Sequence, residues 1–133
     1  KEVLNGDYEL KNVMFQYTEE DSRPILAIRQ LKIKAGEKIA ILGRNGAGKS
    51  TLLQLLAGMQ SPANGSVHLD NLDISLIDPA DVRRDAALLN QNAHMFYGTI
   101  RENLTLGAPL ARDEDILKAL KVTGALGFVQ ELD

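Results

Sequence analysis

Apolar and polar residues alternate near the start of the chain. In residues 8–17 the apolar side chains fall at mostly alternating positions, namely Tyr8, Leu10, Val13, Phe15 and Tyr17. This spacing predicts a strand with one buried face. The apolar stretch at 25–33 predicts a second strand, and the polar residues 19–24 predict the turn that joins the two. We therefore expect two antiparallel strands in this part of the chain.

Two further runs are apolar without interruption, at residues 39–42 and 86–89. Continuous apolar runs of this length are typical of strands covered on both faces, as in a parallel sheet with helices on each side. Between them, a helix is predicted over 51–57, where four leucines leave little polar surface and Gly58 ends the pattern. We expect this helix to pack against the parallel sheet.

The middle of the chain predicts a hairpin followed by a short helix. Asp70-Asn71 stands between the short segments 66–69 and 72–74, and such a dipeptide is typical of tight turns. His68 is expected to be an exposed strand residue. Asp78 followed by Pro79 is typical of a helix N-cap and the first helical position.

Helices are predicted over the last third of the chain. Residues 99–104 and 113–121 have helical patterns, and residues 124–129 continue helically or turn. The patterns together predict an α/β fold, in which an antiparallel β part is followed by a core of parallel strands with flanking helices.

The composition narrows the classes of function. The 133 residues have a net charge of −3 with fifteen scattered basic residues, so we expect no nucleic-acid partner. The sequence has no cysteine, which excludes disulfides, thiolate metal sites and cysteine nucleophiles. Its apolar runs are only a handful of residues long, so none is expected to span a membrane, and residues 1–6 lack the apolar core of a signal peptide. We expect the chain itself to be soluble.

One stretch carries specific chemistry. The residues GRNGAGKST at 43–51 fit the pattern G-x-x-x-x-G-K-[ST]. They follow the predicted strand at 38–42 and lead into the predicted helix, which is the context that a phosphate loop needs. A random window fits this pattern at about 4 in 100,000, so nucleotide binding is strongly favoured over an ordinary glycine-rich turn.

Each residue type in this stretch has a physical role in binding phosphate. Gly43, Gly46 and Gly48 permit backbone angles closed to residues with a Cβ, so successive N–H groups can turn inward and form a concave anion site. The first N–H groups of the following helix and the positive end of its dipole face the same anion. Lys49 then reaches the β- and γ-phosphates, and the Ser50 hydroxyl ligates Mg²⁺.

The order of these elements resembles that in the nucleotide-binding domain of ATP-binding cassette (ABC) transporters. The resemblance covers nearly the whole chain, from Gly6 to Asp133. The resemblance is carried by a strand ending FQY, by GRNGAGKST, by the hairpin GSVHLDNLDI and by the run LLNQNAHMFYGTIRENL. A glutamine loop leading into GTIRENL points to exporter-type cassettes, and NQNAHMFYGT is similar to type I protein-secretion exporters. The resemblance implies a P-loop NTPase core with an amino-terminal antiparallel β subdomain and the start of a helical subdomain.

The resemblance also implies roles for individual residues. Tyr17 matches the aromatic residue that stacks on adenine, with a core tyrosine at a strand end as the open alternative. Lys49 and Gln91 are the implied catalytic residues, and Ser50 and Gln91 the implied Mg²⁺ ligands. The implied nucleotide-binding residues are Tyr17, Gly43, Arg44, Asn45, Gly46, Ala47, Gly48, Lys49, Ser50 and Thr51. The Arg44 side chain is expected to project to solvent.

The implied cofactors are ATP and Mg²⁺, and the implied partners are other domains of a transporter. A second nucleotide-binding domain would pair head to tail with this one, and the region from Gln91 to Leu104 would contact the transmembrane domain. Phe96 and Tyr97 belong to that region, with core packing of the two rings as an open alternative. The implied location is the cytoplasmic face of the bacterial inner membrane.

Several motifs of the family do not occur in the 133 residues: an LSGGQ-type signature, a strand ending in a second Mg²⁺-binding aspartate with its catalytic glutamate, and a switch histidine. We therefore expect an incomplete fold, the amino-terminal part of one cassette. Its expected divisions are an antiparallel β part at 7–36, a P-loop core at 37–92 and the start of a helical subdomain at 93–133. We expect the intact protein to hydrolyse ATP to power export, and this chain alone to bind nucleotide weakly without turning it over.

Two other classes of function compete with this interpretation. One is the nucleotide-binding module of a soluble, non-transport cassette protein, which the exporter-like run from Gln91 to Leu104 disfavours. The other is an unrelated phosphate-loop protein such as a small kinase or GTPase. Those proteins place the loop after their first strand, whereas two strands are predicted before it here, and the sequence has no guanine-specific N-K-x-D motif.

Overall fold

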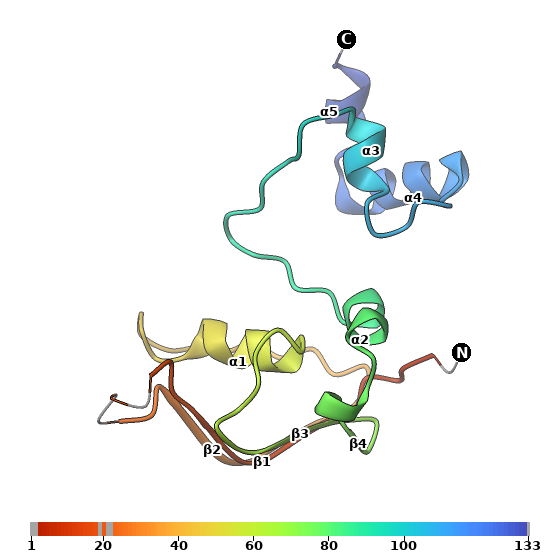
Figure 1. Ribbon diagram of the computed structural model, residues 1–133. Coiled ribbons are helices and arrows are strands. Elements are labelled where there is room, and N and C mark those ends of the chain that lie inside the picture. Colours follow the sequence, from red (N-terminus) through yellow and green to blue (C-terminus); the bar gives the residue numbers. More distant parts are fainter. Residues whose placement is uncertain (1–2, 19, 21–22, 133) are drawn as a thin grey trace. The chain divides into compact units, whose positions relative to one another are not determined.

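The computed structural model describes residues 3–18, 20 and 23–132, and these divide into two compact units, Lys1–Leu89 and Asn90–Asp133. The first unit contains β1 (Tyr8–Phe15), β2 (Leu26–Ile33), α1 (Lys49–Leu56), β3 (Asn64–Leu69), β4 (Leu72–Asp73), a 3₁₀ helix (Ile74–Leu76) and α2 (Pro79–Asp85). The second contains α3 (Ile100–Leu104), α4 (Asp113–Thr123) and α5 (Leu126–Gln130) (Figure 1). Over the described ranges, every helix is too short or too polar to cross a membrane.

The four strands form one antiparallel sheet in the order β2-β1-β3-β4. The two predicted strands and the predicted hairpin are therefore confirmed, and the hairpin joins the other strands through β3. Asp70 and Asn71 at the hairpin turn have φ of 51° and 66°, as a type I′ turn requires. The turn predicted at 19–24 lies largely outside the described residues.

A bulge in β1 explains why its apolar residues alternate imperfectly. β1 has one residue more than β3 next to Asn12, which has φ of 48°. Gly65 on β3 lies so close that a Cβ there would stand 2.2 Å from the Asn12 carbonyl oxygen. Through this irregularity Leu10 and Val13, three positions apart, are both buried.

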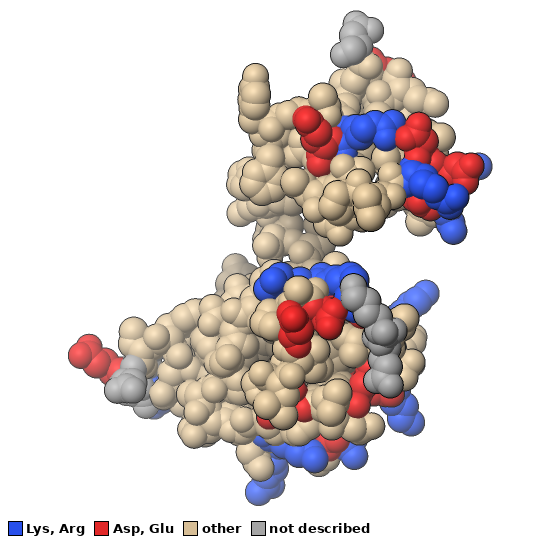
Figure 2. Space-filling view, turned by 45° about the vertical axis from the view of Figure 1, so that its right-hand side comes forward, with Lys and Arg blue, Asp and Glu red and all other residues tan. Residues whose placement is uncertain are grey.

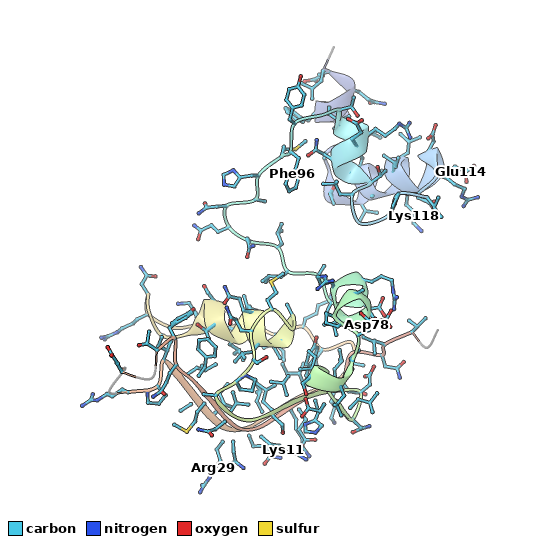
Figure 3. All side chains as sticks on the ribbon, in the orientation of Figure 1. Lys11, Arg29, Asp78, Phe96, Glu114 and Lys118 are labelled. Atoms are coloured by element: carbon cyan, nitrogen blue, oxygen red, sulfur yellow. The ribbon has the colours of Figure 1, made fainter. Side chains whose placement is uncertain are left out.

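Helix α1 covers one face of the sheet (Figure 1). The buried core between them consists of Leu10, Val13, Phe15, Leu52, Leu55 and Val67. On the other face, the exposed side chains of Lys11 and Arg29 point away from α1 (Figure 3). The helix is buried against a sheet as predicted, but this sheet is the antiparallel one, so the expected packing on a parallel sheet is wrong for this structure. Leu53 remains 41% exposed.

The two strands predicted at 38–42 and 86–89 are not formed. Both segments run without ladder pairing, and Leu42 and Leu89 are 92% and 88% exposed. A strand needs a neighbour that bonds to its backbone N–H and C=O groups, and no described segment pairs with either run. These two predictions are wrong for this structure. An apolar run indicates that a segment tends to be buried, but it does not indicate that a neighbouring strand is there to pair with it.

Side-chain hydrogen bonds tie distant parts of the first unit together. The Asp70 carboxylate at the hairpin turn accepts from the N–H groups of Asn5, Gly6 and Asp7 at 2.6 to 3.0 Å. The Tyr8 hydroxyl donates to the Leu56 carbonyl at the end of α1, at 2.8 Å. These bonds attach the segment before β1 to the hairpin, and β1 to α1.

The sequence predicted the cap of α2 correctly and the exposure of His68 incorrectly. Asp78 caps α2 by accepting from the Ala80 N–H at 2.8 Å, with Pro79 as the first helical residue, as predicted. His68 is half-buried, and its Nδ1 is shielded from solvent without a hydrogen-bond partner among the described residues. The prediction of an exposed His68 is wrong, because β3 lies inside the sheet between β1 and β4.

The second unit contains the helices predicted for the end of the chain. Thr99 and Glu102 form a capping box at the start of α3, and Gly124, with φ of 76°, separates α4 from α5. The Arg101 guanidinium pairs with the Asp113 carboxylate at 2.8 Å and so links α3 to α4. Leu120 is the buried apolar residue of this unit among those described.

Candidate nucleotide-binding site

The loop at 43–51 connects the extended segment 38–42 to α1. Gly48 is the N-cap of the helix, and Lys49 is its first residue, so the helix begins two residues earlier than predicted. Ser50 and Thr51 therefore stand in the first turn of α1. The N–H groups of this turn have no partner inside the helix and carry the positive end of its dipole.

The three loop glycines are required for different reasons. Gly46 and Gly48 have φ of 79° and 88°, the left-handed region expected of them. At Gly48 a Cβ would also stand 2.9 Å from the Ile25 carbonyl oxygen, so the helix start lies against the chain just before β2. Gly43 lies outside the left-handed region, which corrects the prediction, and instead a Cβ there would crowd the Ala47 Cβ at 3.3 Å.

Lys49 closes the loop with its side chain. Its ammonium group donates to the carbonyl oxygen of Gly43 and, at 3.0 Å, to that of Arg44. The Ala47 N–H donates to the same Arg44 oxygen at 3.1 Å. In the part of the chain that the structure describes, no backbone carbonyl accepts from the N–H groups of Gly46, Gly48 or Lys49. The loop thus combines a cation with free N–H donors, which is the donor set that a polyphosphate requires.

Two side chains of the loop, Arg44 and Ser50, face solvent, as the sequence predicted for Arg44. The Ser50 hydroxyl stands in the first helical turn. Over the described ranges, no group of three or more His, Asp or Glu side chains could hold a metal ion. A magnesium ion that is coordinated by nucleotide phosphates and water needs only one or two protein ligands. The Ser50 hydroxyl could supply one of them, so the absence of a carboxylate cluster among the described residues does not argue against Mg²⁺.

Tyr17 lies beside the first turn of α1. Its hydroxyl is 3.1 Å from the Thr51 hydroxyl, and its ring meets Phe15 edge to face, with centroids 4.9 Å apart. The residue is 58% exposed, which is contrary to the alternative of a core tyrosine. The sequence assigned Tyr17 and Thr51 to one site but did not predict their contact. The two residues are 34 positions apart, and no sequence pattern indicates a hydrogen bond over that separation.

Gln91 belongs to the second unit, whereas the phosphate loop belongs to the first. Gln91 is exposed, and its pairing with Ser50 around a metal ion stays a prediction. Phe96 and Tyr97 are 70% and 109% exposed, so the alternative of core packing is wrong for both rings. Asn103 bonds to the backbone N–H and C=O of Phe96, at 2.7 and 2.9 Å, and so holds the Phe96 backbone next to α3.

Comparison with known proteins decides the family. The profile of the ABC transporter family matches residues 26–131, which include the loop and all the helices. The chain belongs to the ABC transporter family. Membership implies that the loop at 43–51 is part of an ATP-binding domain.

Curated relatives in the ABC transporter family cover almost all of the chain. It is 40% identical over 134 residues to a protein of Rickettsia felis named "Putative export ATP-binding/permease protein", covering 98% of this chain and 23% of that protein. It is 40% identical over 129 residues to the leukotoxin translocation ATP-binding protein LktB of Mannheimia glucosida, covering 97% of this chain and 18% of LktB. The chain therefore spans less than a quarter of the length of these relatives.

A solved structure supports the same fold. The chain aligns over its full length with a bacterial Atm1-family ABC exporter with ATP bound, at a TM-score of 0.89 and 28% identity, and covers 23% of that chain. The prediction of a P-loop NTPase fold with an amino-terminal antiparallel β subdomain is confirmed at this level. The domain divisions at residues 36 and 92 stay predictions.

Proposed function

We propose that this chain is the ATP-binding part of an ABC exporter ATPase, which couples ATP binding and hydrolysis to transport across a membrane. The observation that carries the proposal is the loop at 43–51, where free N–H donors and the Lys49 ammonium group gather at the start of α1. The names of the two relatives include the words export and translocation, and these words support the direction of transport.

In this proposal the loop binds the phosphates, and Tyr17 binds the base. The N–H groups of residues 43–51 and the positive end of α1 stabilise the negative charge of the triphosphate. Lys49 turns from the carbonyls of Gly43 and Arg44 toward the β- and γ-phosphates. The exposed ring of Tyr17 stacks on adenine, for which a flat aromatic face is sufficient.

Ser50 and Gln91 would complete the site when Mg²⁺ accompanies ATP. Mg²⁺ would offset the negative charge of the phosphates, and the oxygen of the Ser50 hydroxyl, in the first turn of α1, would be one of its ligands. The amide oxygen of Gln91 can ligate the metal or orient water without taking up a proton. We propose that Lys49 and Gln91 act in catalysis and that Ser50 and Gln91 hold the metal.

The proposed partners are a second nucleotide-binding domain and a transmembrane domain contacted by Gln91 to Leu104, at the cytoplasmic face of the membrane. The exposed rings of Phe96 and Tyr97 support an interface there, since aromatic side chains are enriched at the centre of interfaces. On the face shown in Figure 2, basic side chains lie beside acidic ones. This mixture gives no support to a nucleic-acid partner. The names of LktB and of the exotoxin translocation protein PaxB of Pasteurella aerogenes support a polypeptide as cargo.

The direct test is Lys49→Ala in the intact protein. We expect ATP hydrolysis to be lost and the Kd for ATP to rise by about tenfold or more, because a charge-assisted contact to phosphate is removed. Binding is measured by titration with a fluorescent ATP analogue in the presence of Mg²⁺. Lys118→Ala, which removes an exposed lysine from α4, is the matched control and should behave as the wild type.

Three results would contradict the proposal or the expectations attached to it. Unchanged ATP binding and hydrolysis in Lys49→Ala would remove the loop from the mechanism. Sustained hydrolysis by the isolated 133-residue chain, lost on Lys49→Ala, would show that residues 1–133 contain the whole catalytic site and would overturn the expected dependence on other parts of the protein. If the intact protein bound ATP but fractionated away from membranes, the alternative of a non-transport cassette protein would be favoured.

A further inference from the structure

We propose that Thr51 is a positioning residue that ties the base-stacking ring of Tyr17 to the first turn of α1. The bond between the two hydroxyls would hold the site for the base at a set distance from the site for the phosphates. This inference rests on the proposed function, because it states how the same site positions the base relative to the triphosphate.

Thr51 is placed for this role by its burial. It is 3% exposed and is the buried polar residue of the core among those described. A buried hydroxyl is costly unless it has a hydrogen-bond partner, and the partner here is the Tyr17 hydroxyl at 3.1 Å. Thr51 follows Lys49 and Ser50 in the first turn of α1, so the bond from its hydroxyl to Tyr17 links the ring to the same turn that carries these two residues.

The Tyr17 ring lies mostly outside the core. It lies two residues beyond the end of β1 and is 58% exposed. Two contacts restrict it: Phe15 packs against it edge to face, with an interplanar angle of 87°, and Thr51 holds its hydroxyl. A ring restricted before the nucleotide arrives loses less conformational entropy when a base stacks on it.

A second tyrosine provides a control at the other end of the same helix. Tyr8, at the start of β1, donates its hydroxyl to the Leu56 carbonyl at 2.8 Å. Both tyrosines therefore bond β1 or its extension to α1, but only Tyr17 does so in the turn that contains Lys49. If the hydroxyl bonds served only to fasten α1 to the sheet, removing either hydroxyl would have the same kind of effect.

The experiment uses the intact protein and two ligands, MgATP and inorganic tripolyphosphate with Mg²⁺, which has no base. The variants are Tyr17→Phe, Thr51→Val, their double mutant, Thr51→Ser, which keeps the hydroxyl, and Tyr8→Phe. We expect Tyr17→Phe and Thr51→Val each to raise the Kd for ATP about fivefold, the effect of one neutral hydrogen bond. The double mutant should be no weaker than either single variant, because both remove the same bond.

The contrast between ligands distinguishes positioning from folding. We expect the Kd for tripolyphosphate to stay within about twofold of the wild type in Tyr17→Phe, because in the proposed site the Tyr17 ring contacts the base and not the phosphates. Thr51→Ser should restore ATP affinity, and Tyr8→Phe should leave the ratio of the two Kd values unchanged. Thermal melting of each variant sets a temperature at which all of them are folded.

The inference is overturned if the effects of Tyr17→Phe and Thr51→Val on the Kd for ATP are additive in the double mutant. It is also overturned if Tyr17→Phe raises the Kd for ATP and the Kd for tripolyphosphate by the same factor. A third contrary result would be that Tyr8→Phe changes the ratio of these two Kd values as Tyr17→Phe does. Failure of the proposed function gives a different result: the wild type does not bind ATP, or Lys49→Ala binds ATP as well as the wild type does, and the inference then falls with it.

Discussion

Tyr8 shows how much the surroundings of a single side chain matter in this molecule. The residue is half-buried, and its hydroxyl donates to the Leu56 carbonyl. Desolvation raises the pKa of Tyr8, and the negative charge of Asp70 raises it further. Both causes disfavour the phenolate, and a phenolate cannot donate to a carbonyl. The bond that fastens β1 to the end of α1 therefore depends on a neutral Tyr8.

This dependence predicts a loss of stability at alkaline pH. The folded pKa of Tyr8 lies above the unfolded value of 10.0, so its contribution is complete below pH 10.0 and is lost as pH rises through the folded pKa. Between about pH 8 and pH 11, the free energy of unfolding measured with urea should fall more in the wild type than in Tyr8→Phe. At neutral pH, Tyr8→Phe should cost about 1 kcal/mol.

The control is Tyr97→Phe, which removes a phenol that is 109% exposed and should leave the alkaline loss as it is in the wild type. Equal losses in the wild type and in Tyr8→Phe would contradict the prediction.

At the scale of an element, α3 shows how a helix of only five residues is stabilised by hydrogen bonds at its amino-terminal end. The Thr99 hydroxyl accepts from the Glu102 N–H at 3.1 Å, and the Glu102 carboxylate accepts from the Thr99 N–H at 2.7 Å. A helix this short has little intrinsic stability, so its reciprocal caps decide whether it forms. The bond from the Thr99 N–H lowers the pKa of Glu102, and the Thr99 hydroxyl, which also donates to the Glu102 carboxylate at 3.1 Å, lowers it further.

We therefore predict that Thr99→Ala raises the pKa of Glu102 toward its ordinary value and increases fraying of α3. The folded pKa of Glu102 is depressed, so the contribution of the cap is present above the unfolded pKa and is lost as pH falls through the folded one. NMR titration of the Glu102 carboxyl group measures the shift. Thr105→Ala, which removes a hydroxyl bonded to the Arg101 carbonyl at the other end of α3, is the control and should not change the titration. An unchanged titration in Thr99→Ala would show that the capping box does not persist in solution.

At the scale of the whole molecule, the buried apolar residues are distributed unequally between the two units. The first unit contains nearly all of those that the structure describes: Leu10, Val13, Phe15, Leu52, Leu55, Ala57, Val67, Leu69 and Val82. The second contains Leu120, while large side chains such as Phe96, Leu110 and Phe128 are mostly exposed. Resistance to opening follows buried apolar contact, so the two units should differ in local stability.

Amide hydrogen exchange should reveal this difference. We predict that the slowest amides of β1 and β3 exchange at least about tenfold more slowly than the slowest amides of α4. Leu55→Ala, which removes a fully buried side chain, should cost about 2 to 5 kcal/mol and speed exchange in β1 and β3. It should leave α4 unaffected if the units open separately. If the slowest amides of both units exchanged at the same rate, the predicted difference in local stability would be contradicted.

The amino-acid sequence by itself determined the features whose causes lie within a few residues. The type I′ turn at Asp70-Asn71, the cap of α2 by Asp78 and the left-handed angles of Gly46 and Gly48 all follow from the conformational limits and short-range bonding of those residues. The phosphate loop belongs to the same class, because its chemistry is contained in the 43–51 stretch and the helix that begins there.

Only the tertiary structure decided which segments meet. It placed the hairpin strand β3 against β1, covered α1 with that sheet and left the apolar runs at 39–42 and 86–89 without strand partners. It also brought Tyr17 to Thr51. The physical reason is that an apolar run or a buried hydroxyl specifies the kind of neighbour it needs, whereas the choice of neighbour depends on contacts between residues far apart in the chain.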